Sequence, residues 1–422
     1  MELLRFTTAG SVDDGKSTLI GRLLYDCGVV FKDQLAAIEA LSQRKGLSEP
    51  DLALLMDGLS AEREQGITID VAYQYFSTPK RRFIIADVPG HEQYTRNMVT
   101  GASTANLAVI LVDATKGFLL QMKRHLFIAT LLRIPHVLVA INKMDRVDYR
   151  EDIYEALRLQ ISDYASKLRI NDLQFIPISA LKGDMVVERH DHLSWYRGYT
   201  LKDYLENLHI VSDRNLLDFR FPIQYVLRPH SQFRGYAGTI ESGVIKLGDE
   251  AVILPSRKKT RIKSILLPDS EGVSYAFTPQ AVVLTLEDEV DASRGDMIVR
   301  YGNFPEVGQA FEAAICWFSE EPLIEKQTYI LKQTTKSTRC FVDTLRYRIN
   351  MNTLHREAVK ELAFNDIGRA YVKVHEPLCF DSYEHNRNTG SFILIDELTY
   401  QTVGAGIIWN RSPQQDILDV IA

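Results

Sequence analysis

The sequence contains few cysteines, and those it has lie far apart. Cys27, Cys316, Cys340 and Cys379 form no C-x-x-C pair. They suggest neither a disulfide framework nor a cysteine-based metal site, so we expect reduced thiols in a cytoplasmic protein. No apolar run is long enough to span a membrane, and no signal peptide precedes the first predicted strand. The composition therefore favours neither a membrane protein nor a secreted, disulfide-rich one.

An excess of positive charge is also missing. Lys and Arg total 49 against 55 Asp and Glu, which gives a net charge of −6. Neither half of the chain is markedly basic, so we expect no nucleic-acid partner. The 422 residues are 45% hydrophobic and 25% charged, which is ordinary for a globular protein with two to four domains.

The first half of the chain alternates strand patterns with helix patterns. The predicted strands are Leu3–Ala9, Arg82–Asp87, Leu107–Asp113, His136–Asn142 and Gln174–Ser179. The predicted helices are Ser17–Tyr25, Tyr94–Ala102, Met122–Leu132 and Tyr149–Leu168. This alternation predicts an α/β domain over residues 1–211, with helices on both faces of a mostly parallel sheet. Ligands of such sheets bind beyond the carboxyl ends of the strands.

After residue 212 the pattern changes to short alternating strands separated by turns. Gly243, Gly248, Gly272 and Gly295 lie among these turns. The pattern predicts all-β barrels or sandwiches. We place one over residues 212–305 and a second over residues 306–422.

A glycine-rich loop joins the first predicted strand to the first predicted helix. It fits G-x-x-x-x-G-K-[ST] and comprises Gly10, Ser11, Val12, Asp13, Asp14, Gly15, Lys16 and Ser17, with Thr18 next. Such glycines let backbone N–H groups face a phosphate, to which the helix N-terminus adds more donors. We expect Lys16 to reach the outer phosphates and the Ser17 hydroxyl to bind Mg²⁺. A chance glycine turn is the alternative, and the strand–loop–helix context disfavours it.

The second predicted strand ends in Asp87-Val88-Pro89-Gly90, and His91 follows. An Asp at this position can hold Mg²⁺ through a water, and the Gly90 amide can meet a terminal phosphate. We expect His91 to stand near the γ-phosphate and to orient the attacking water. A simple strand-ending turn with a solvated histidine is the alternative.

The motif Asn142-Lys143-Met144-Asp145 follows an apolar strand. The Asp145 carboxylate can accept from the ring N1–H and the exocyclic amine of guanine, and adenine offers no such pair of donors. A site built on these hydrogen bonds rejects the wrong base because buried polar groups would be left unpaired. We expect Asn142 to tie the base-binding loop to the phosphate loop, and the Lys143 stem to cover the base.

Two weaker motifs complete the expected site. Ser179-Ala180-Leu181 follows the next strand, and its backbone N–H groups would contact the guanine carbonyl. The polar loop Glu62–Asp70 lies between the phosphate loop and Asp87, and its Thr68 is the expected second hydroxyl ligand of Mg²⁺. Such a loop can be ordered by the γ-phosphate and the metal. A charged, solvated loop is the alternative.

These motifs, in this order and spacing, resemble the translational GTPase superfamily of elongation factors Tu and 1-alpha. The resemblance implies a GTPase domain followed by two β-barrels, with GTP and Mg²⁺ as cofactors. It covers essentially the whole chain. The motifs are specific for GTP and are not specific for translation.

Three stretches resemble one branch of the superfamily, the GTPase subunits of bacterial sulfate adenylyltransferases. They are Ser17–Asp26, Asp87–Met98 and the late stretch Asn386–Asp396, whose letters are N-R-N-T-G-S-F-I-L-I-D. The short run Met56–Leu59, which precedes the polar loop, also resembles that branch. In that branch GTP hydrolysis is coupled to the synthesis of adenylyl sulfate and pyrophosphate from ATP and sulfate on a smaller catalytic subunit. The resemblance implies this partner, in a heterodimer or larger assembly. No second G-x-x-x-x-G-K follows, so we expect no adenylyl-sulfate kinase activity.

Two other functions remain open from the sequence. An elongation factor that binds aminoacyl-tRNA would share all the GTPase motifs, although the Asp14 and Ser17 form of the phosphate loop and the late stretch disfavour it. A regulatory GTPase with no coupled chemistry is the second alternative, and the barrels would then be partner-binding modules or spacers. Binding of charged tRNA, and the response of GTP turnover to ATP and sulfate, distinguish these possibilities.

Overall fold

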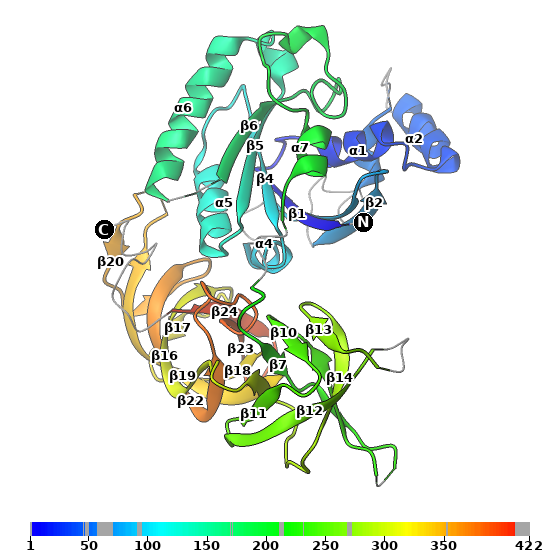
Figure 1. Ribbon diagram of the computed structural model, residues 1–422. Coiled ribbons are helices and arrows are strands. Elements are labelled where there is room, and N and C mark those ends of the chain that lie inside the picture. Colours follow the sequence, from blue (N-terminus) through cyan, green and yellow to red (C-terminus); the bar gives the residue numbers. More distant parts are fainter. Residues whose placement is uncertain are drawn as a thin grey trace. The chain divides into compact units, whose positions relative to one another are not determined.

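The computed structural model describes residues 2–44, 46, 50–56, 71–90, 95–168, 170, 172–210, 215–230, 232–267, 272–351 and 353–409 (Figure 1). These residues fall into two compact units. The first contains the described chain up to Ile210 and the stretch Met351–His355, and the second contains the remainder. No helix in the described ranges is long and apolar enough to cross a membrane.

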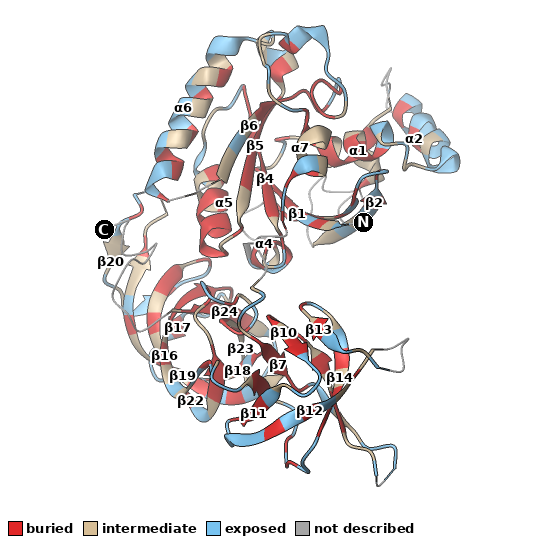
Figure 2. Ribbon diagram, viewed as in Figure 1, coloured by how far each residue is buried: buried red, intermediate tan, exposed pale blue. Residues whose placement is uncertain are grey.

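A six-stranded sheet forms the centre of the first unit, in the order β2-β3-β1-β4-β5-β6. Its strands are β1 (Leu3–Ala9), β2 (Ala72–Ser77), β3 (Arg82–Asp87), β4 (Leu107–Asp113), β5 (His136–Asn142) and β6 (Asp172–Pro177). All neighbours are parallel except β2 and β3. The central strand β4 is buried along its whole length (Figure 2). Burial on both faces explains why its sequence, LAVILVD, is a continuous apolar run rather than an alternating one.

Helices cover both faces of this sheet. They are α1 (Lys16–Asp26), α2 (Lys32–Arg44), α4 (Thr95–Ala102), α5 (Leu120–Leu131), α6 (Glu151–Lys167) and α7 (Leu201–Asn207), with 3-10 turns η1 (Leu52–Leu55), η3 (Met144–Val147) and η4 (Asp191–Leu193). Helices α1 and α7 lie on one face, and α5 and α6 lie on the other (Figure 1). The predicted fold class, an α/β domain with a mostly parallel sheet, is confirmed.

The last strand of this domain begins and ends two residues earlier than predicted. Its observed range is Asp172–Pro177 rather than Gln174–Ser179. Ser179 instead forms an isolated bridge with Asp184, which turns the chain away from the sheet. The sequence patterns did not predict three elements: the edge strand β2 and the helices α2 and α7. The loop Glu62–Asp70 lies outside the described residues.

The second unit is entirely β-structured in its described part. Its first sheet has the order β7-β15-β11-β12-β14-β9-β8. The strands are β7 (Arg220–Pro222), β8 (Tyr225–Leu227), β9 (Gly235–Thr239), β11 (Glu250–Leu254), β12 (Lys258–Leu266), β14 (Ala281–Leu286) and β15 (Met297–Arg300), beside the ribbon of β10 (Val244–Lys246) and β13 (Tyr275–Phe277). Phe221 and Tyr236 lie in its core.

The second sheet of this unit has the order β18-β23-β24-β16-β22-β19-β20, and pairing of β18 with β19 closes it into a barrel. The strands are β16 (Glu306–Trp317), β18 (Thr328–Gln333), β19 (Lys336–Ile349), β20 (Arg356–Glu357), β22 (Ile367–Phe380), β23 (Ser391–Ile395) and β24 (Thr402–Ile408), beside the pair β17 (Leu323–Ile324) and β21 (Glu361–Leu362). Phe311 and Trp317 lie in its separate core. Two β-barrel domains thus follow the α/β domain, as predicted, and the residue boundaries at 211/212 and 305/306 stay predictions.

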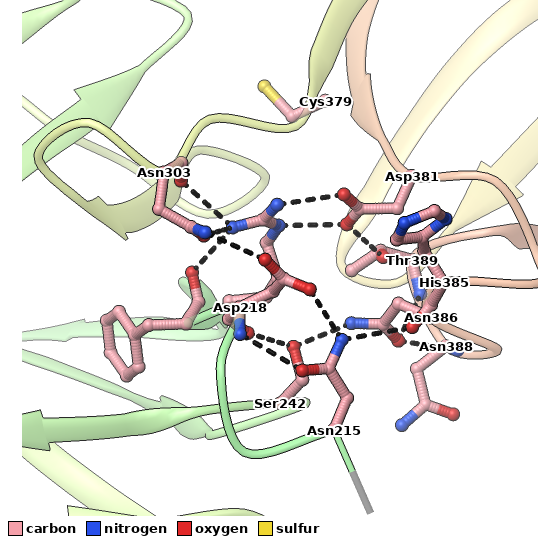
Figure 3. A network of polar contacts seen from close by, with 12 residues as sticks. Asn215, Asp218, Ser242, Asn303, Cys379, Asp381, His385, Asn386, Asn388 and Thr389 are labelled. Carbon is pink, nitrogen blue, oxygen red and sulfur yellow. Dashed lines mark hydrogen bonds and ion pairs between the residues drawn. The ribbon is translucent and has the colours of Figure 1, made fainter.

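An ion pair joins the two barrels. Arg220 of β7 donates from Nε and Nη2 to the two carboxylate oxygens of Asp381, at 2.8 and 2.9 Å (Figure 3). The Arg220 side chain is 3% exposed and that of Asp381 is 11% exposed. Each keeps a further partner, because Arg220 Nη1 donates to Asn303 Oδ1 at 2.7 Å and Thr389 Oγ1 donates to Asp381 Oδ2 at 2.7 Å. The buried charges are therefore fully hydrogen-bonded, the condition under which such a pair is tolerated.

The late stretch Asn386–Asp396 supplies the rest of this junction. Asn386 Nδ2 donates to Ser242 Oγ at 2.8 Å (Figure 3). Asn388 Nδ2 donates to Glu241 Oε2 at 2.5 Å. Both acceptors belong to the other barrel. Asn386 and Asn388 of the N-R-N-T-G stretch therefore have a structural role, because they connect one barrel to the other.

We predict that Arg220→Ala lowers the free energy of unfolding of the second unit by about 3 kcal/mol, because it leaves the Asp381 carboxylate buried and without its partner. Urea unfolding followed by the fluorescence of the buried Trp317 measures the change. Arg261→Ala is the matched control, because its ion pair with Glu250 is more than half exposed and contributes about 1 kcal/mol at most. Equal unfolding midpoints for the two variants would contradict the prediction.

Candidate functional site

The carboxyl ends of β1, β3, β4 and β5 meet at one edge of the sheet, and predicted motifs follow β1, β3 and β5. The strand register places Thr8 beside Asp87 and Asp113 beside Asn142. Four loops that are distant in sequence therefore converge, as expected for the ligand edge of a parallel sheet.

The phosphate loop requires glycine at position 15. Gly15 has a φ of +91°, a left-handed conformation that side chains disfavour. A Cβ there would lie 2.5 Å from Asn142 Nδ2. The loop therefore approaches the β5 loop too closely for any larger residue.

Lys16 is the first residue of α1, and its side chain folds back over the loop. The residue is 7% exposed, and its Nζ lies 3.5 Å from the Gly10 carbonyl oxygen. Burial lowers the pKa of Lys16, while the nearby carboxylates of Asp87 and Asp14 act in the opposite direction. A buried ammonium beside a helix N-terminus is a strong site for a phosphate anion.

Asp14 braces the phosphate loop from within. Its Oδ2 accepts from the Ser11 N–H at 2.7 Å. Within the described part of the chain, its buried Oδ1 has no hydrogen-bond partner. Burial raises the pKa of this carboxyl, although the hydrogen bond from Ser11 opposes the shift.

Asp87 ends β3 with its side chain inside the protein. It is 1% exposed, and its Oδ1 accepts from Thr8 Oγ1 at 2.8 Å. Three residues later the chain touches the phosphate loop, because a Cβ on Gly90 would lie 2.2 Å from Gly10 O and 2.7 Å from Lys16 Nζ. Only glycine fits at this contact.

Helix α5 holds the same turn from the other side. Gln121 Nε2 donates to the Gly90 carbonyl oxygen at 3.1 Å and lies 3.4 Å from His125 Nε2. Burial lowers the pKa of His125 to about 3, so this histidine is neutral at pH 7. Sequence reasoning missed Gln121, because nothing in the helix pattern singles it out.

Asn142 connects three loops through one buried side chain. Its Nδ2 donates to the Asp14 carbonyl oxygen at 2.8 Å, and its Oδ1 accepts from the Ala180 N–H at 2.9 Å. The residue is 2% exposed. Asn142 therefore connects the phosphate loop to the loop after β6, and the base-binding role of this region stays a prediction.

Lys143 is tethered at its tip. Its Nζ donates to Asp113 Oδ2 at 2.7 Å and also to the Asp13 carbonyl oxygen. Burial works to raise the pKa of Asp113, but hydrogen bonds from Lys143 and Thr115 outweigh it, and the pKa is lowered. Asp113 was also missed, although a carboxylate that ends a fully buried strand is a recognisable signal.

Asp145 lies in the 3-10 turn η3, and Ser179 orients it. Ser179 Oγ donates to Asp145 Oδ1 at 2.6 Å. A carboxylate held in this way can present acceptors to two donors on one edge of a purine.

The structure places the remaining expected residues as follows. Ser17 and Thr18 lie in the first turn of α1, Val88 and Pro89 follow β3, Met144 and Ala180 are buried, and Leu181 is 48% exposed. Thr68 and His91 lie outside the described residues. In the described ranges, no group of three or more His, Cys, Asp or Glu side chains is arranged to hold a metal ion.

Family models match both ends of the chain. A model of the elongation factor Tu GTP binding domain matches residues 1–219, and a GTP-eEF1A C-terminal domain-like model matches residues 310–409.

Curated relatives match nearly the whole chain. Sulfate adenylyltransferase subunit 1 of Bacteroides fragilis is 51% identical over 418 residues, 99% of this chain and 88% of that protein. The protein of the same name from Alteromonas mediterranea is 54% identical over 409 residues, 96% of this chain and 87% of that protein. A bifunctional enzyme CysN/CysC of Rhodopirellula baltica is 53% identical over 414 residues; the match covers 97% of this chain and 64% of that enzyme.

We predict that Asp145→Asn reverses the base preference of the site. An amide can accept one hydrogen bond and donate another, which suits the 2-carbonyl of xanthine and leaves one guanine donor unpaired. GDP affinity should fall about a hundredfold, and xanthosine diphosphate affinity should rise. Calorimetric titration of both nucleotides measures this, and an unchanged preference for GDP would remove Asp145 from the base-reading role.

Proposed function

The chain belongs to the sulfate adenylyltransferase subunit 1 family, and from this membership we propose that it is the GTP-hydrolysing subunit of a two-subunit sulfate adenylyltransferase. Its reaction couples GTP hydrolysis to the formation of adenylyl sulfate and pyrophosphate from ATP and sulfate. The observation that carries the proposal is the sequence identity, 51% and 54%, to two proteins named sulfate adenylyltransferase subunit 1. The matches cover 88% and 87% of the length of those proteins.

The described loops support the nucleotide part of the proposal. Glycines at positions 15 and 90 leave room where any Cβ would clash. Among the described residues, the buried Lys16 ammonium makes one weak hydrogen bond, to the Gly10 carbonyl oxygen at 3.5 Å. We propose that Lys16 neutralises the β- and γ-phosphates. Loop residues 10–15 and the first turn of α1 would surround them with N–H donors.

The same edge of the sheet suits Mg²⁺. Hydroxyl and carboxylate oxygens are the ligands that this hard cation prefers. We propose that Ser17 and Thr68 bind it directly and that Asp87 binds it through a water. The ion would supply positive charge to the β- and γ-phosphate oxygens.

Guanine recognition occupies the other end of the site. Asp145 would accept from the base, the Lys143 stem would cover it, and the 179–181 loop would donate to its carbonyl. Asn142 keeps the base and phosphate ends in register through its two hydrogen bonds. We propose that His91 orients the attacking water.

The adenylyl-transfer step belongs to a partner in this proposal. The name subunit 1 implies a second subunit, and we propose that it is a smaller catalytic subunit that binds ATP and sulfate in the cytoplasm. Formation of adenylyl sulfate from ATP is uphill, so GTP hydrolysis can drive it only if a conformational change links the two sites.

We predict that GTP turnover by this chain rises when the small subunit, ATP and sulfate are added together. In the complex, adenylyl sulfate should form in step with phosphate from GTP. Phosphate release and adenylyl sulfate formation are measured in one reaction that contains sulfate. The comparison reactions contain selenate in place of sulfate, or neither anion. The elongation-factor alternative would be favoured if the rate of GTP hydrolysis did not change on addition of the partner, ATP and sulfate, and if the chain instead bound charged tRNA.

We predict that His91→Ala leaves GDP and GTP affinity within about threefold of wild type and lowers the rate of GTP hydrolysis at least tenfold, because water positioning acts mainly in the transition state. The exposed His209, which follows α7, provides the control variant His209→Ala. If His91→Ala weakened nucleotide binding as much as it slowed hydrolysis, the residue would have a structural role instead.

A further inference from the structure

The loop that follows β6 is a tight turn that offers one unused donor. The Ser179 N–H donates to the Asp184 carbonyl oxygen at 3.1 Å, and the Gly183 N–H donates to the Ser179 carbonyl oxygen at 2.8 Å. Ser179 Oγ accepts from the Lys182 N–H at 3.2 Å, and Asn142 takes the Ala180 N–H. In the described chain the Leu181 N–H has no hydrogen-bond acceptor.

An arginine from the phosphate-binding helix holds this loop. Arg22 of α1 donates from Nε to the Ala180 carbonyl oxygen at 3.3 Å and from Nη2 to the Leu181 carbonyl oxygen at 2.6 Å. Its Nη1 lies 3.6 Å from Asp26 Oδ1, one helical turn further on, and its side chain is 19% exposed. The planar guanidinium therefore has fixed contacts on two sides.

Because the peptide bond is planar, these two contacts also fix the directions of the neighbouring N–H groups. The Ala180 carbonyl and the Leu181 N–H belong to one planar trans peptide and point in opposite directions. A donor that fixes the carbonyl therefore also fixes the direction of the N–H. The second contact fixes in the same way the peptide that joins Leu181 to Lys182, whose N–H donates to Ser179 Oγ.

We propose that Arg22 is a positioning residue for guanine specificity: by holding the carbonyl of Ala180 it aims the free Leu181 N–H at the O6 atom of the base. The inference rests on the proposed GTP binding and extends it to a residue outside the nucleotide motifs. Because Arg22 lies on the helix that begins at Lys16, it also links base reading to the phosphate end of the site.

The test is a calorimetric comparison of Arg22→Ala with wild type, using GDP, 6-thio-GDP and IDP. 6-Thio-GDP replaces O6 by a poorer acceptor and keeps the N1–H and the exocyclic amine. IDP keeps O6 and lacks the amine that Asp145 reads. In Arg22→Ala we expect about tenfold weaker GDP binding. The preference for GDP over 6-thio-GDP should shrink at least threefold, while that over IDP should stay within about twofold.

Controls separate this role from simple stabilisation. Arg158→Ala removes an arginine from an ion pair with Glu155 on the surface of α6 and should bind all three nucleotides like wild type. Arg22→Lys keeps the charge but cannot make both contacts, and it serves if the alanine variant does not fold; it should show the same selective loss.

Each outcome has one meaning. A selective loss of the O6 preference supports the proposal. Unchanged binding, or an equal loss for all three nucleotides, overturns it and leaves Arg22 as a structural residue. Failure of wild type itself to bind GDP would instead overturn the proposed GTP binding.

Discussion

One buried side chain, that of Asn142, joins the phosphate loop to the loop after β6. Its amide donates to the phosphate loop and accepts from the loop after β6, so neither loop can shift without losing a buried hydrogen bond. An unsatisfied buried amide costs about 1–3 kcal/mol, enough to keep the loops together. Lys143 adds a second connection, because its Nζ joins the loop after β5 to Asp13 of the phosphate loop and to Asp113 at the end of β4.

The same principle operates in the second unit. There the buried Arg220–Asp381 pair and the Asn386 amide connect strands and loops that are far apart in sequence. In both units apolar strands build the framework, and a few fully satisfied polar side chains fix its loops against one another. Such networks specify one arrangement because a half-made network is costly.

The regular parts of the structure were predictable from the sequence, because local patterns determine them. The strands Leu3–Ala9, Arg82–Asp87, Leu107–Asp113 and His136–Asn142 have their predicted bounds. The first run ends before the glycine-rich loop, and the other three end at an Asp or Asn. The edge strand β2 escaped prediction, because its alternating tyrosines lack that signal. Arg22, Gln121 and Asp113 escaped too, because their roles depend on partners 30 to more than 150 residues away. The roles of Thr68 and His91 remain predictions.

The central claim is that Asn142 makes the phosphate and base loops one site, and its most direct test is nucleotide binding by Asn142→Ala. Calorimetry with GDP and with pyrophosphate separates the two ends, and the exposed Asn207→Ala variant is the control. The account predicts about a hundredfold weaker GDP binding and weaker pyrophosphate binding as well, because the phosphate loop loses its brace. Unchanged pyrophosphate binding, with only the base side affected, would contradict it.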